Sequence, residues 1–423
     1  MTFSRREFIK WASAVSALSA AGCASIGKGP SIGRVVVVGG GFAGAAAAKY
    51  IRKWGPSIDV TLVERNPEFI SCPMSNLVLG GSRSMGDITM GYRGLSKYGV
   101  KVVRDEVVAV DPEKRTVKLA SDESLSYDRL VLAPGIDFMY DQIPGLNNNL
   151  AQEKILHAWK AGVQTMALRK QLEAMKDGGI YALHIPKSPY RCPPGPYERA
   201  CQVADYFKSH KPKSKVLILD ANDDVQSKKG LFTKAWNERY KGIVEYRPNS
   251  GLLDVNVATM SLKLEVDDIK ADVINVIPAQ KAGKITADLK LNNANNRFCT
   301  VDFLTYESTA AKNIHVIGDS IQAAPGMAKS GSMANQQAKV CAAAVVALIS
   351  GHPVNDQPMM VNTCYSFVDA KEVVHVASVH RYDATKKTMV TVEGSGGLSP
   401  APNALEGEYA WAWAKSIWAD TLA

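Results

Sequence analysis

The stretch Gly39-Gly40-Gly41-Phe42-Ala43-Gly44 decides the fold of this chain. It follows an apolar run at 35–38 and precedes an alanine-rich run at 45–51, so a strand, a tight turn and a helix are predicted in that order. The first glycine allows the turn, the third lets backbone amides approach a pyrophosphate, and the last lets the helix pack on the strand. The start of the helix offers unpaired N–H groups and a positive dipole to phosphates. The stretch therefore predicts a βαβ unit that binds an adenine dinucleotide.

An acidic residue and a cysteine follow this unit at informative distances. A second predicted strand at 60–63 ends at Glu64, about twenty residues past Gly44, where a carboxylate can bond the ribose hydroxyls. Cys72 comes next, in the segment that follows the acid. This order suggests that the dinucleotide is a flavin and that Cys72 holds it by a covalent bond. The alternative is a glycine-rich turn in some other α/β protein.

Two later segments extend the same unit. The sequence from 101 to 132 predicts a series of short strands, and the last of them is followed by Ala133-Pro134-Gly135. The apolar strand at 313–317 ends in Gly318-Asp319. This combination is typical of two-dinucleotide flavoproteins, in which the aspartate reaches the ribityl chain and the pyrophosphate of FAD. We expect the helix at about 334–349 to point its amide end at the flavin and to stabilise negative charge on the reduced form.

The segment between these parts predicts a second nucleotide-type fold without its nucleotide. Its entry strand at 215–220 continues as Ala221-Asn222-Asp223-Asp224, so no glycine trio allows the close approach of a pyrophosphate. NAD(P)H is therefore disfavoured as the electron donor. The predicted fold class is α/β, with two Rossmann-like dinucleotide-binding domains of the glutathione-reductase type, the second without a fingerprint, and a C-terminal α+β domain. The predicted divisions are a signal segment at 1–30, an FAD-binding domain at 31–145 and 285–350, the second Rossmann-like domain at 146–284, and the C-terminal domain at 351–423.

The least ordinary segment is the proline-rich stretch 189–200, which carries a candidate reactive cysteine. Prolines and a glycine fix the loop directly after Cys192, and a helix is predicted to begin near residue 196. Because Arg191 and the helix start are close in sequence, we expect the pKa of Cys192 to be lowered and its thiolate to react readily. Glu198, in the first turn of that helix, is a candidate to move a proton. The plain alternatives are an inert structural thiol and a helix-start acid.

The C-terminal part carries a second cysteine of interest and a cluster of aromatic residues. Cys364 lies in a polar stretch that indicates a loop or an edge strand. Trp411 and Trp418 are one heptad apart on a predicted helix and share a face with Lys415. Packing into the core is the ordinary interpretation of these tryptophans, and docking to a partner or to a membrane surface is the alternative.

The first thirty residues are best interpreted as an export signal. Ser4-Arg5-Arg6-Glu7-Phe8-Ile9-Lys10 is a twin-arginine pattern, and the apolar stretch at 11–21 is too short and too rich in alanine and serine to span a bilayer stably. A periplasmic location follows. A lipoprotein-type cleavage box ends at Cys23, and whether this residue is lipidated or removed is left open. The alternative is the basic N-terminus of a cytoplasmic enzyme.

Composition excludes several classes of protein. The net charge of +9 is spread along the chain, which disfavours nucleic acid as a partner and leaves an acidic protein partner open. The seven cysteines form no CxxC pattern, so no metal site is predicted. In an oxidising compartment a disulfide is expected, but the spacing does not say which cysteines pair. No apolar run reaches the length of a transmembrane helix.

The combined motifs resemble the flavoprotein subunit of flavocytochrome c sulfide dehydrogenase, from about Arg34 to the C-terminus. The marks of this resemblance are Val35–Gly41, Ser71–Asn76, His157–Gly162, Arg191–Glu198 and Asn362–Ser366. The resemblance implies that Cys72 is bonded through sulfur to the 8α-methyl group of FAD. It also implies that Cys192 and Cys364 form a redox-active disulfide next to the isoalloxazine, and that hydrosulfide attacks it. The implied electron acceptor is a c-type cytochrome subunit, which would carry the haem.

Three other functions remain as alternatives. Sulfide:quinone oxidoreductase shares the scaffold and a cysteine-based sulfide site, but it lies on a membrane and reduces quinone. An electron-transfer or assembly protein would bind FAD without turning over sulfide. An NADH-dependent disulfide reductase would need the second glycine fingerprint, which the sequence lacks. The residues expected to act are Cys192, Cys364 and Glu198 in catalysis, and Gly39, Gly41, Gly44, Glu64, Cys72, Gly318 and Asp319 in binding the cofactor.

Overall fold

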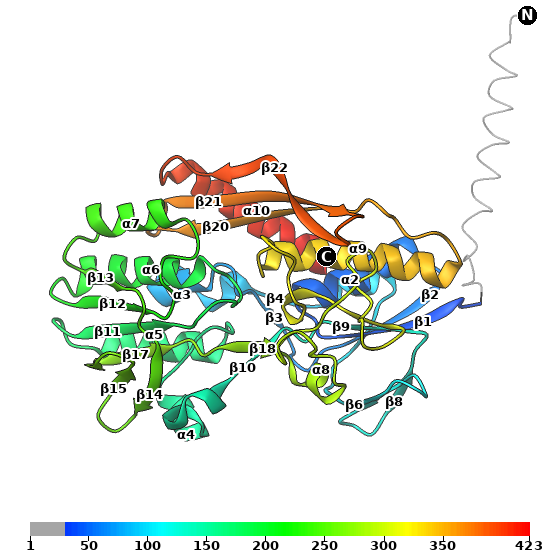
Figure 1. Ribbon diagram of the computed structural model, residues 1–423, viewed down its shortest axis with the longest axis horizontal. Coiled ribbons are helices and arrows are strands. Elements are labelled where there is room, and N and C mark those ends of the chain that lie inside the picture. The colour runs from blue at the N-terminus through cyan, green and yellow to red at the C-terminus, as the bar shows by residue number, and fades with distance from the viewer. Residues whose placement is uncertain (1–29) are drawn as a thin grey trace, which may run out of the picture.

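The computed structural model describes residues 30–423, so the twin-arginine pattern and Cys23 lie outside the described part of the chain. Figure 1 shows two lobes, each built around a parallel sheet, and a C-terminal layer that lies across the top of both. The predicted α/β class with two Rossmann-like units and a C-terminal α+β unit is confirmed.

The first lobe is built around a five-stranded parallel sheet with the order β19-β9-β1-β2-β5. The valine run of the central strand pairs on both sides, with Val35 opposite Val60 on one neighbour and Arg129 on the other. Because both faces of this strand are covered, its valines are almost entirely buried. The helices α2 and α9 pack against each other on one face of the sheet. The bounds are β1 Gly33–Val38, α2 Phe42–Trp54, β2 Ile58–Val63, β5 Lys101–Val103, β9 Arg129–Leu132, β19 Ile314–Val316 and α9 Gly331–Ser350.

Short elements surround this sheet and connect it to the second lobe. A three-stranded antiparallel sheet, β6-β7-β8, lies at the edge of the first lobe, and the pair β10-β18 lies at the junction of the lobes. The bounds are β3 Phe69–Ile70, α3 Ser75–Gly80, β4 Thr89–Met90, β6 Val107–Asp111, β7 Thr116–Leu119, β8 Ser124–Ser126, β10 Ile136–Phe138, β18 Gln280–Ala282 and α8 Lys284–Asp288. The 3₁₀ helices are η2 Met85–Ile88, η3 Arg93–Tyr98, η4 Tyr140–Gln142, η5 Pro144–Leu146 and η6 Gly318–Ser320.

The second lobe is built around a four-stranded parallel sheet with the order β13-β12-β11-β17. The end of β12, where a dinucleotide would approach in a Rossmann fold, is filled by the protein's own polar groups. Asp220 accepts hydrogen bonds from the Asn222 backbone N–H at 2.9 Å, the Tyr197 hydroxyl at 2.8 Å and the Tyr246 hydroxyl at 3.2 Å. The bounds are α4 Asn149–Lys154, α5 Val163–Ala174, β11 Ile180–Ile185, α6 Gly195–His210, β12 Lys215–Asp220, α7 Lys229–Glu238, β13 Val244–Arg247, β14 Leu252–Asn256, β15 Ser261–Leu264, β16 Asp268–Lys270 and β17 Val273–Val276.

The C-terminal layer consists of an antiparallel sheet with the order β20-β21-β22 and the helix α10. Its outer strand β20 contacts α9 of the first lobe and α6 of the second, so this strand joins the two lobes. The bounds are β20 Met359–Phe367, β21 Val373–Asp383, β22 Thr388–Leu398 and α10 Ala404–Leu422.

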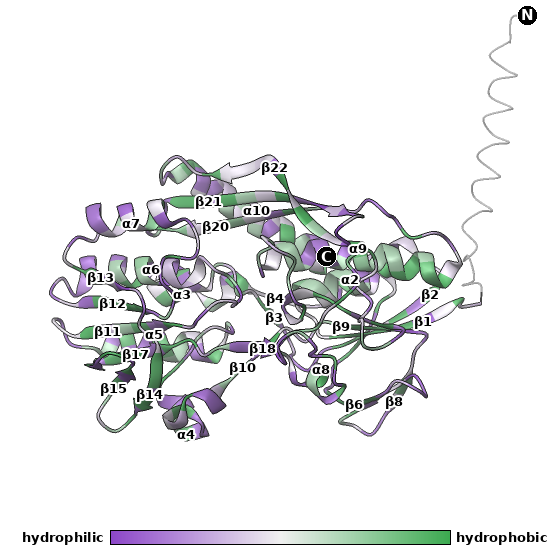
Figure 2. Ribbon diagram, viewed as in Figure 1, coloured by the Kyte–Doolittle hydropathy of each residue, from purple (hydrophilic) through white to green (hydrophobic). Residues whose placement is uncertain are grey.

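The hydropathy of the elements matches this arrangement. Figure 2 shows apolar residues concentrated in the strands of the first sheet and in α9, with polar residues on α4, α7 and the outer loops. The indole N–H of Trp418 donates to the Ser71 hydroxyl at 3.0 Å, and the rings of Trp411 and Trp418 meet edge to face. These contacts support packing as the role of the two tryptophans. Within residues 30–423, no helix combines the length and apolar character that a membrane span requires.

Candidate functional site

A cavity of about 940 Å³ lies where the two lobes meet the C-terminal layer. The predicted site residues, which are distant from one another in the sequence, come together on its walls. Those that line it are Gly39, Gly41, Glu64, Cys72, Cys192, Glu198, Gly318, Asp319 and Cys364. Gly44 is not among them, because it lies one helical turn inside α2.

The glycine turn has the geometry that a bound dinucleotide needs. Gly39 adopts a positive φ of 98°, which L side chains rarely adopt. A Cβ on Gly44 would lie 1.8 Å from the Gly39 carbonyl oxygen, so only glycine lets the helix approach the strand here. A Cβ on Gly41 would meet nothing within 4 Å, because this residue faces the cavity. The first amides of α2 therefore face the cavity, where a helix start can bind a phosphate group.

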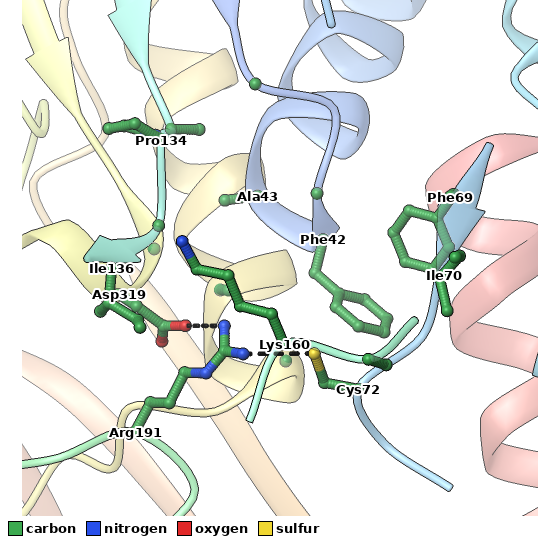
Figure 3. A pocket seen from close by; sticks show the side chains of 18 of the residues that line it. Phe42, Ala43, Phe69, Ile70, Cys72, Pro134, Ile136, Lys160, Arg191 and Asp319 are labelled. Carbon is green, nitrogen blue, oxygen red and sulfur yellow. Dashed lines mark hydrogen bonds and ion pairs between the residues drawn. The ribbon is translucent and has the colours of Figure 1, made fainter. Parts of the chain in front are cut away.

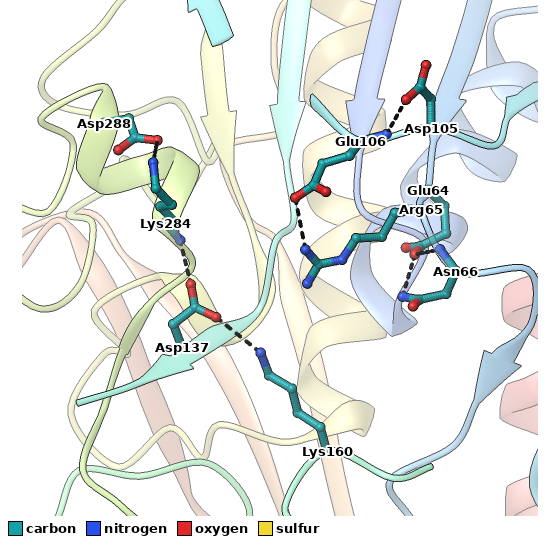
Figure 4. Close-up of polar contacts among 9 residues, drawn as sticks. All are labelled: Glu64, Arg65, Asn66, Asp105, Glu106, Asp137, Lys160, Lys284 and Asp288. Atoms are coloured by element: carbon teal, nitrogen blue, oxygen red, sulfur yellow. Dashed lines mark hydrogen bonds and ion pairs between the residues drawn. The ribbon is translucent and has the colours of Figure 1, made fainter. Parts of the chain in front are cut away.

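Glu64 at the end of the second strand is fixed against this turn (Figure 4). One carboxylate oxygen accepts the Gly40 N–H at 2.6 Å, and the other accepts the Asn66 backbone N–H at 2.7 Å and its side-chain amide at 2.6 Å. The carboxylate lines the cavity beside the glycine turn. Its bond to a ribose stays a prediction.

Asp319 supplies the observation that tests the fit of a flavin dinucleotide. Its Oδ1 atom is buried without a hydrogen-bond partner among the described residues, and its Oδ2 atom lies 3.6 Å from Nη1 of Arg191. A buried carboxylate oxygen without a donor is costly, and a ligand hydroxyl in the cavity would satisfy it. Together with the open Gly41, this shows that the residues present fit a dinucleotide with a polyhydroxylated chain.

Arg191 joins two of the predicted cofactor residues across the cavity (Figure 3). Its Nη2 atom lies 3.3 Å from the Cys72 sulfur and also donates to the Trp159 carbonyl. Its Nη1 atom faces Asp319. The sequence had suggested Arg191 as the neighbour of Cys192, but the structure places its guanidinium on Cys72 and Asp319 instead.

Cys192 comes to the cavity from the second lobe and Cys364 from the C-terminal layer, and both are free cysteines in this structure. Cys192 adopts a positive φ of 56°, and its N–H donates to the Lys329 carbonyl at 2.7 Å, which fixes the loop. A Cβ on Gly195 would lie 2.8 Å from the Cys192 sulfur and 2.8 Å from the Trp159 ring, so the start of α6 must be glycine here. Cys364 lies on β20, an edge strand of its sheet. Their pairing as a disulfide stays a prediction.

Three family models cover most of the described chain. "Sulfide dehydrogenase [flavocytochrome c] flavoprotein chain, central" matches residues 165–278, "Flavocytochrome c sulphide dehydrogenase, flavin-binding" matches 356–422, and "Pyridine nucleotide-disulphide oxidoreductase" matches 33–171. The "Sulfide dehydrogenase [flavocytochrome c] flavoprotein chain" of Chlorobaculum thiosulfatiphilum is 67% identical over 45 residues, which are 94% of that sequence and 11% of this chain. The chain belongs to this flavoprotein family. The resemblance inferred from the sequence motifs is confirmed.

More distant relatives share the scaffold. The mitochondrial sulfide:quinone oxidoreductase of Dictyostelium discoideum is 23% identical over 306 residues, which are 69% of this chain and 66% of that protein. The match to its mouse counterpart is 25% identical and covers 42% of that protein, so the matched region spans less than two thirds of either relative. The solved structure of the sulfide:quinone oxidoreductase from Aquifex aeolicus is similar in fold, with a TM-score of 0.72 at 18% identity over 92% of this chain and 91% of that one.

One expectation about Cys192 in this flavoprotein is wrong. The structure raises the pKa of the Cys192 thiol, chiefly because the sulfur is surrounded by protein, and the neighbouring Cys364 and Glu198 add to the effect. Arg191 opposes this rise but does not outweigh it, since its guanidinium contacts Cys72 and Asp319. Burial also raises the pKa of Cys364, against the opposing charge of Lys228. The expected direction of the pKa shift of Cys192 was wrong because adjacency in sequence does not show where the Arg191 side chain points.

Glu198 is a buried acid on the wall of the site. One carboxylate oxygen accepts the Phe367 backbone N–H at 2.8 Å, and the other accepts the Asn76 side-chain amide at 2.8 Å. Burial raises the pKa of Glu198, while these two hydrogen bonds oppose the rise. The carboxyl group can therefore hold a proton inside the cavity at a pH where an exposed glutamate is ionised.

Sequence reasoning missed four polar residues of this flavoprotein site. Arg199 is buried, and its guanidinium donates to the His157 and Ala158 carbonyls at 2.8 and 2.6 Å. The side-chain oxygen of Asn76 accepts a hydrogen bond from Arg199 at 3.1 Å. In the sequence, Asn76 had served only as part of a motif that marks the family resemblance. The remaining two are Lys160 and Lys228.

Lys160 lies in the middle of the cavity (Figures 3 and 4). Its ammonium is 3.1 Å from Asp137, whose other oxygen accepts the Lys284 backbone N–H at 2.8 Å. Burial lowers the pKa of Lys160, and Asp137 opposes that change. No spacing rule marks either lysine, since their positions follow only from the fold.

Proposed function

We propose that this chain is the catalytic flavoprotein subunit of a sulfide dehydrogenase. It oxidises hydrosulfide to sulfur or polysulfide through a Cys192–Cys364 disulfide and FAD, and the electrons pass to a c-type cytochrome subunit. The observation that carries the proposal is that Cys192, Cys364 and Cys72 line one cavity together with the glycine turn for a dinucleotide. Membership of the flavocytochrome c flavoprotein family supports the choice of substrate and acceptor.

The first chemical step belongs to the two cysteines. Hydrosulfide attacks one sulfur of the disulfide, the bond between Cys192 and Cys364 breaks, and a new sulfur–sulfur bond forms to the incoming sulfur. The electron pair of the broken bond stays on the other cysteine as a thiolate. A second sulfide or a sulfur chain then removes the product. When bound, FAD supplies a two-electron acceptor that can release its electrons one at a time.

The remaining residues bind, orient and supply protons. The amides of the glycine turn and Glu64 would hold the adenosine and pyrophosphate part of FAD, and Asp319 would hold the ribityl part. Glu198 keeps a proton within the cavity for transfer to or from sulfur. Cys72 would hold the flavin through a thioether bond, and its place on the wall of the same cavity is the supporting observation.

The location is proposed from the sequence. The twin-arginine pattern at 4–10 supports export to the periplasm, and Cys23 offers a site for a lipid anchor. Replacing Arg5 and Arg6 with lysine should leave the protein in the cytoplasmic fraction if this proposal is correct. Unchanged recovery from the periplasm would overturn it.

Anaerobic titration of the purified holoprotein with sulfide tests the catalytic role. We expect sulfide to bleach the flavin of the wild type and to fail with Cys192→Ala. If Cys192→Ala is reduced at the wild-type rate, the cysteine pair is not the sulfide site, and an electron-transfer protein that merely carries FAD becomes the better description. Acid precipitation should leave the flavin in the pellet, and flavin in the supernatant would contradict attachment through Cys72.

The likeness to sulfide:quinone oxidoreductases favours a second candidate, a membrane-associated enzyme that reduces quinone. The electron acceptor distinguishes the two candidate functions. We expect sulfide and oxidised cytochrome c to react in the presence of the native protein without added quinone. Reduction of a soluble quinone analogue, with no reduction of cytochrome c, would instead support the second candidate.

A further inference from the structure

Lys228 places a buried ammonium group beside the strand that carries Cys364. The residue directly precedes α7, adopts a positive φ of 54° and is only 5% exposed. Its Nζ atom donates to the Cys364 carbonyl at 2.7 Å, the Ser366 hydroxyl at 2.9 Å and the Val374 carbonyl at 3.0 Å. A cation from the second lobe is thus inserted between β20 and β21 of the C-terminal layer.

All three hydrogen-bond partners of this ammonium are neutral oxygens. Within residues 30–423 Lys228 forms no ion pair, whereas the neighbouring Lys229 pairs with Asp224 at the surface at 2.5 Å. Moving an ammonium group out of water is costly unless a negative charge compensates it. The groups that face Lys228 with negative charge when ionised are Cys364, Glu198, Cys192 and Glu406.

Three of these groups are not permanent anions. Burial raises the pKa of Glu198, which favours its neutral form, and burial likewise raises the pKa of the Cys364 and Cys192 thiols. Glu406 is held elsewhere, because it accepts from the Ser399 hydroxyl at 2.5 Å and lies 2.9 Å from His375. Burial lowers the pKa of Lys228 to about 8, so the ammonium form persists at neutral pH. The site therefore holds a cation for which no permanent partner is built in.

The proposed reaction brings a negative charge to this place. Hydrosulfide enters with one negative charge; when it attacks the Cys192 sulfur, the Cys192–Cys364 bond breaks, the new sulfur–sulfur bond forms to Cys192, and the electron pair stays on Cys364 as a thiolate. We propose that Lys228 is a positioning residue that fixes the Cys364 backbone and offsets the negative charge of the Cys364 thiolate. This inference rests on the proposed function, since it assigns a charge partner to the reduced cysteine pair.

The test measures the thiolate directly, without sulfide. In a Cys192→Ser background Cys364 cannot pair with Cys192, and its rate of alkylation by iodoacetamide follows its thiolate fraction. The rate is measured on the flavin-loaded full chain from about pH 6 to about pH 10, a range that brackets ordinary thiol titration. Mass spectrometry of the peptide that contains Cys364 reports the modification.

Three variants are compared in that background. We expect Lys228→Met to move the alkylation midpoint to higher pH, so that the rate near neutral pH falls about tenfold, as one unit of pKa requires. Lys229→Met removes the same charge from the surface and should change the rate less than about twofold. Lys228→Arg should keep most of the wild-type rate. If Lys228→Met does not fold, as judged by Tm and flavin absorption, Lys228→Gln replaces it and retains a hydrogen-bond donor.

Equal midpoints in Lys228→Met, or in Lys228→Gln where it replaces that variant, and in Lys229→Met would overturn the inference. Its failure is distinguishable from that of the proposed function, because bleaching of the wild-type flavin by sulfide is measured separately. Bleaching with equal midpoints would leave the proposed function standing and remove the role of Lys228. A shifted midpoint without bleaching would support the charge partner and remove sulfide as the substrate.

Discussion

The carboxylate of Glu198 accepts the backbone N–H of Phe367 at 2.8 Å, which ties the helix that follows the Cys192 loop to the strand that carries Cys364. The two cysteines belong to different layers of the fold, so this bond is one of the contacts that set their relative position. Lys228 makes the complementary contact with the Cys364 carbonyl on the same strand. One buried acid and one buried base therefore hold β20 against the second lobe.

The first prediction concerns the dependence of stability on pH. Burial raises the pKa of Glu198 above its ordinary value of 4.5, so the folded protein binds this proton more tightly than the unfolded chain does. The contribution of Glu198 to stability is therefore fully present below about pH 4.5 and is lost as the pH rises through the folded-state pKa. Glu198→Gln has no proton to lose. We expect its Tm to improve relative to wild type as the pH is raised.

Thermal unfolding of both proteins between about pH 5 and about pH 8 measures this difference. Glu238→Gln, on the exposed side of α7, serves as the control and should show a constant offset from wild type. An offset for Glu198→Gln that does not change with pH would show that Glu198 is ionised throughout. The same variant should bleach with sulfide about 100-fold more slowly if Glu198 transfers a proton in the reaction.

The second prediction concerns Arg191 and the attachment of flavin. Arg191→Met removes the donor 3.3 Å from the Cys72 sulfur and leaves Asp319 without its cation. Because Arg191 holds both Cys72 and Asp319 on the cavity wall, its loss should lower the flavin content of the purified protein. We also expect a smaller share of flavin in the pellet after acid precipitation, because the sulfur is no longer held by Arg191.

Arg247→Met is the matched control, since Arg247 pairs with Asp267 at 2.8 Å in a part of the second lobe that does not line the cavity. Its flavin content and covalent share should equal those of wild type. An Arg191→Met protein with a full complement of acid-stable flavin would show that the contact with Cys72 has no part in attachment.

The parts of the fold that local sequence rules govern were predicted well. The valine run and the glycine turn specify a strand and a helix start by themselves, and the apolar run at 215–220 forms a strand of the second parallel sheet as predicted. At the end of that strand Asp220 accepts hydrogen bonds from the Tyr197 hydroxyl and the Asn222 backbone N–H. These features depend on backbone conformation and apolar burial, which short stretches of sequence determine.

The electrostatics of the site could not be predicted in the same way. Cys192 was expected to have a lowered pKa because Arg191 precedes it, but the arginine points to Cys72 and burial raises the thiol pKa. Lys228 stands beside another lysine in the sequence, a pattern typical of solvent-exposed surface, yet its ammonium is enclosed by β20 and β21. Burial of a polar group is a property of the tertiary structure, and only the assembled layers show it.

The last prediction separates the two roles of glycine in the dinucleotide turn. Gly44→Ala places a Cβ 1.8 Å from the Gly39 carbonyl, so helix and strand must move apart and the protein should lose stability even without flavin.

Gly41→Ala should instead leave the stability of the protein unchanged and weaken flavin binding. Its φ of −71° suits alanine and the Cβ meets no protein atom within 4 Å, so the Tm of the apoprotein should match wild type. The same methyl group projects into the cavity, where it would block the pyrophosphate and lower flavin occupancy. Tm of flavin-free protein and the ratio of flavin to protein absorbance measure the two effects. Full flavin occupancy in Gly41→Ala would mean that the dinucleotide does not approach the backbone at this turn.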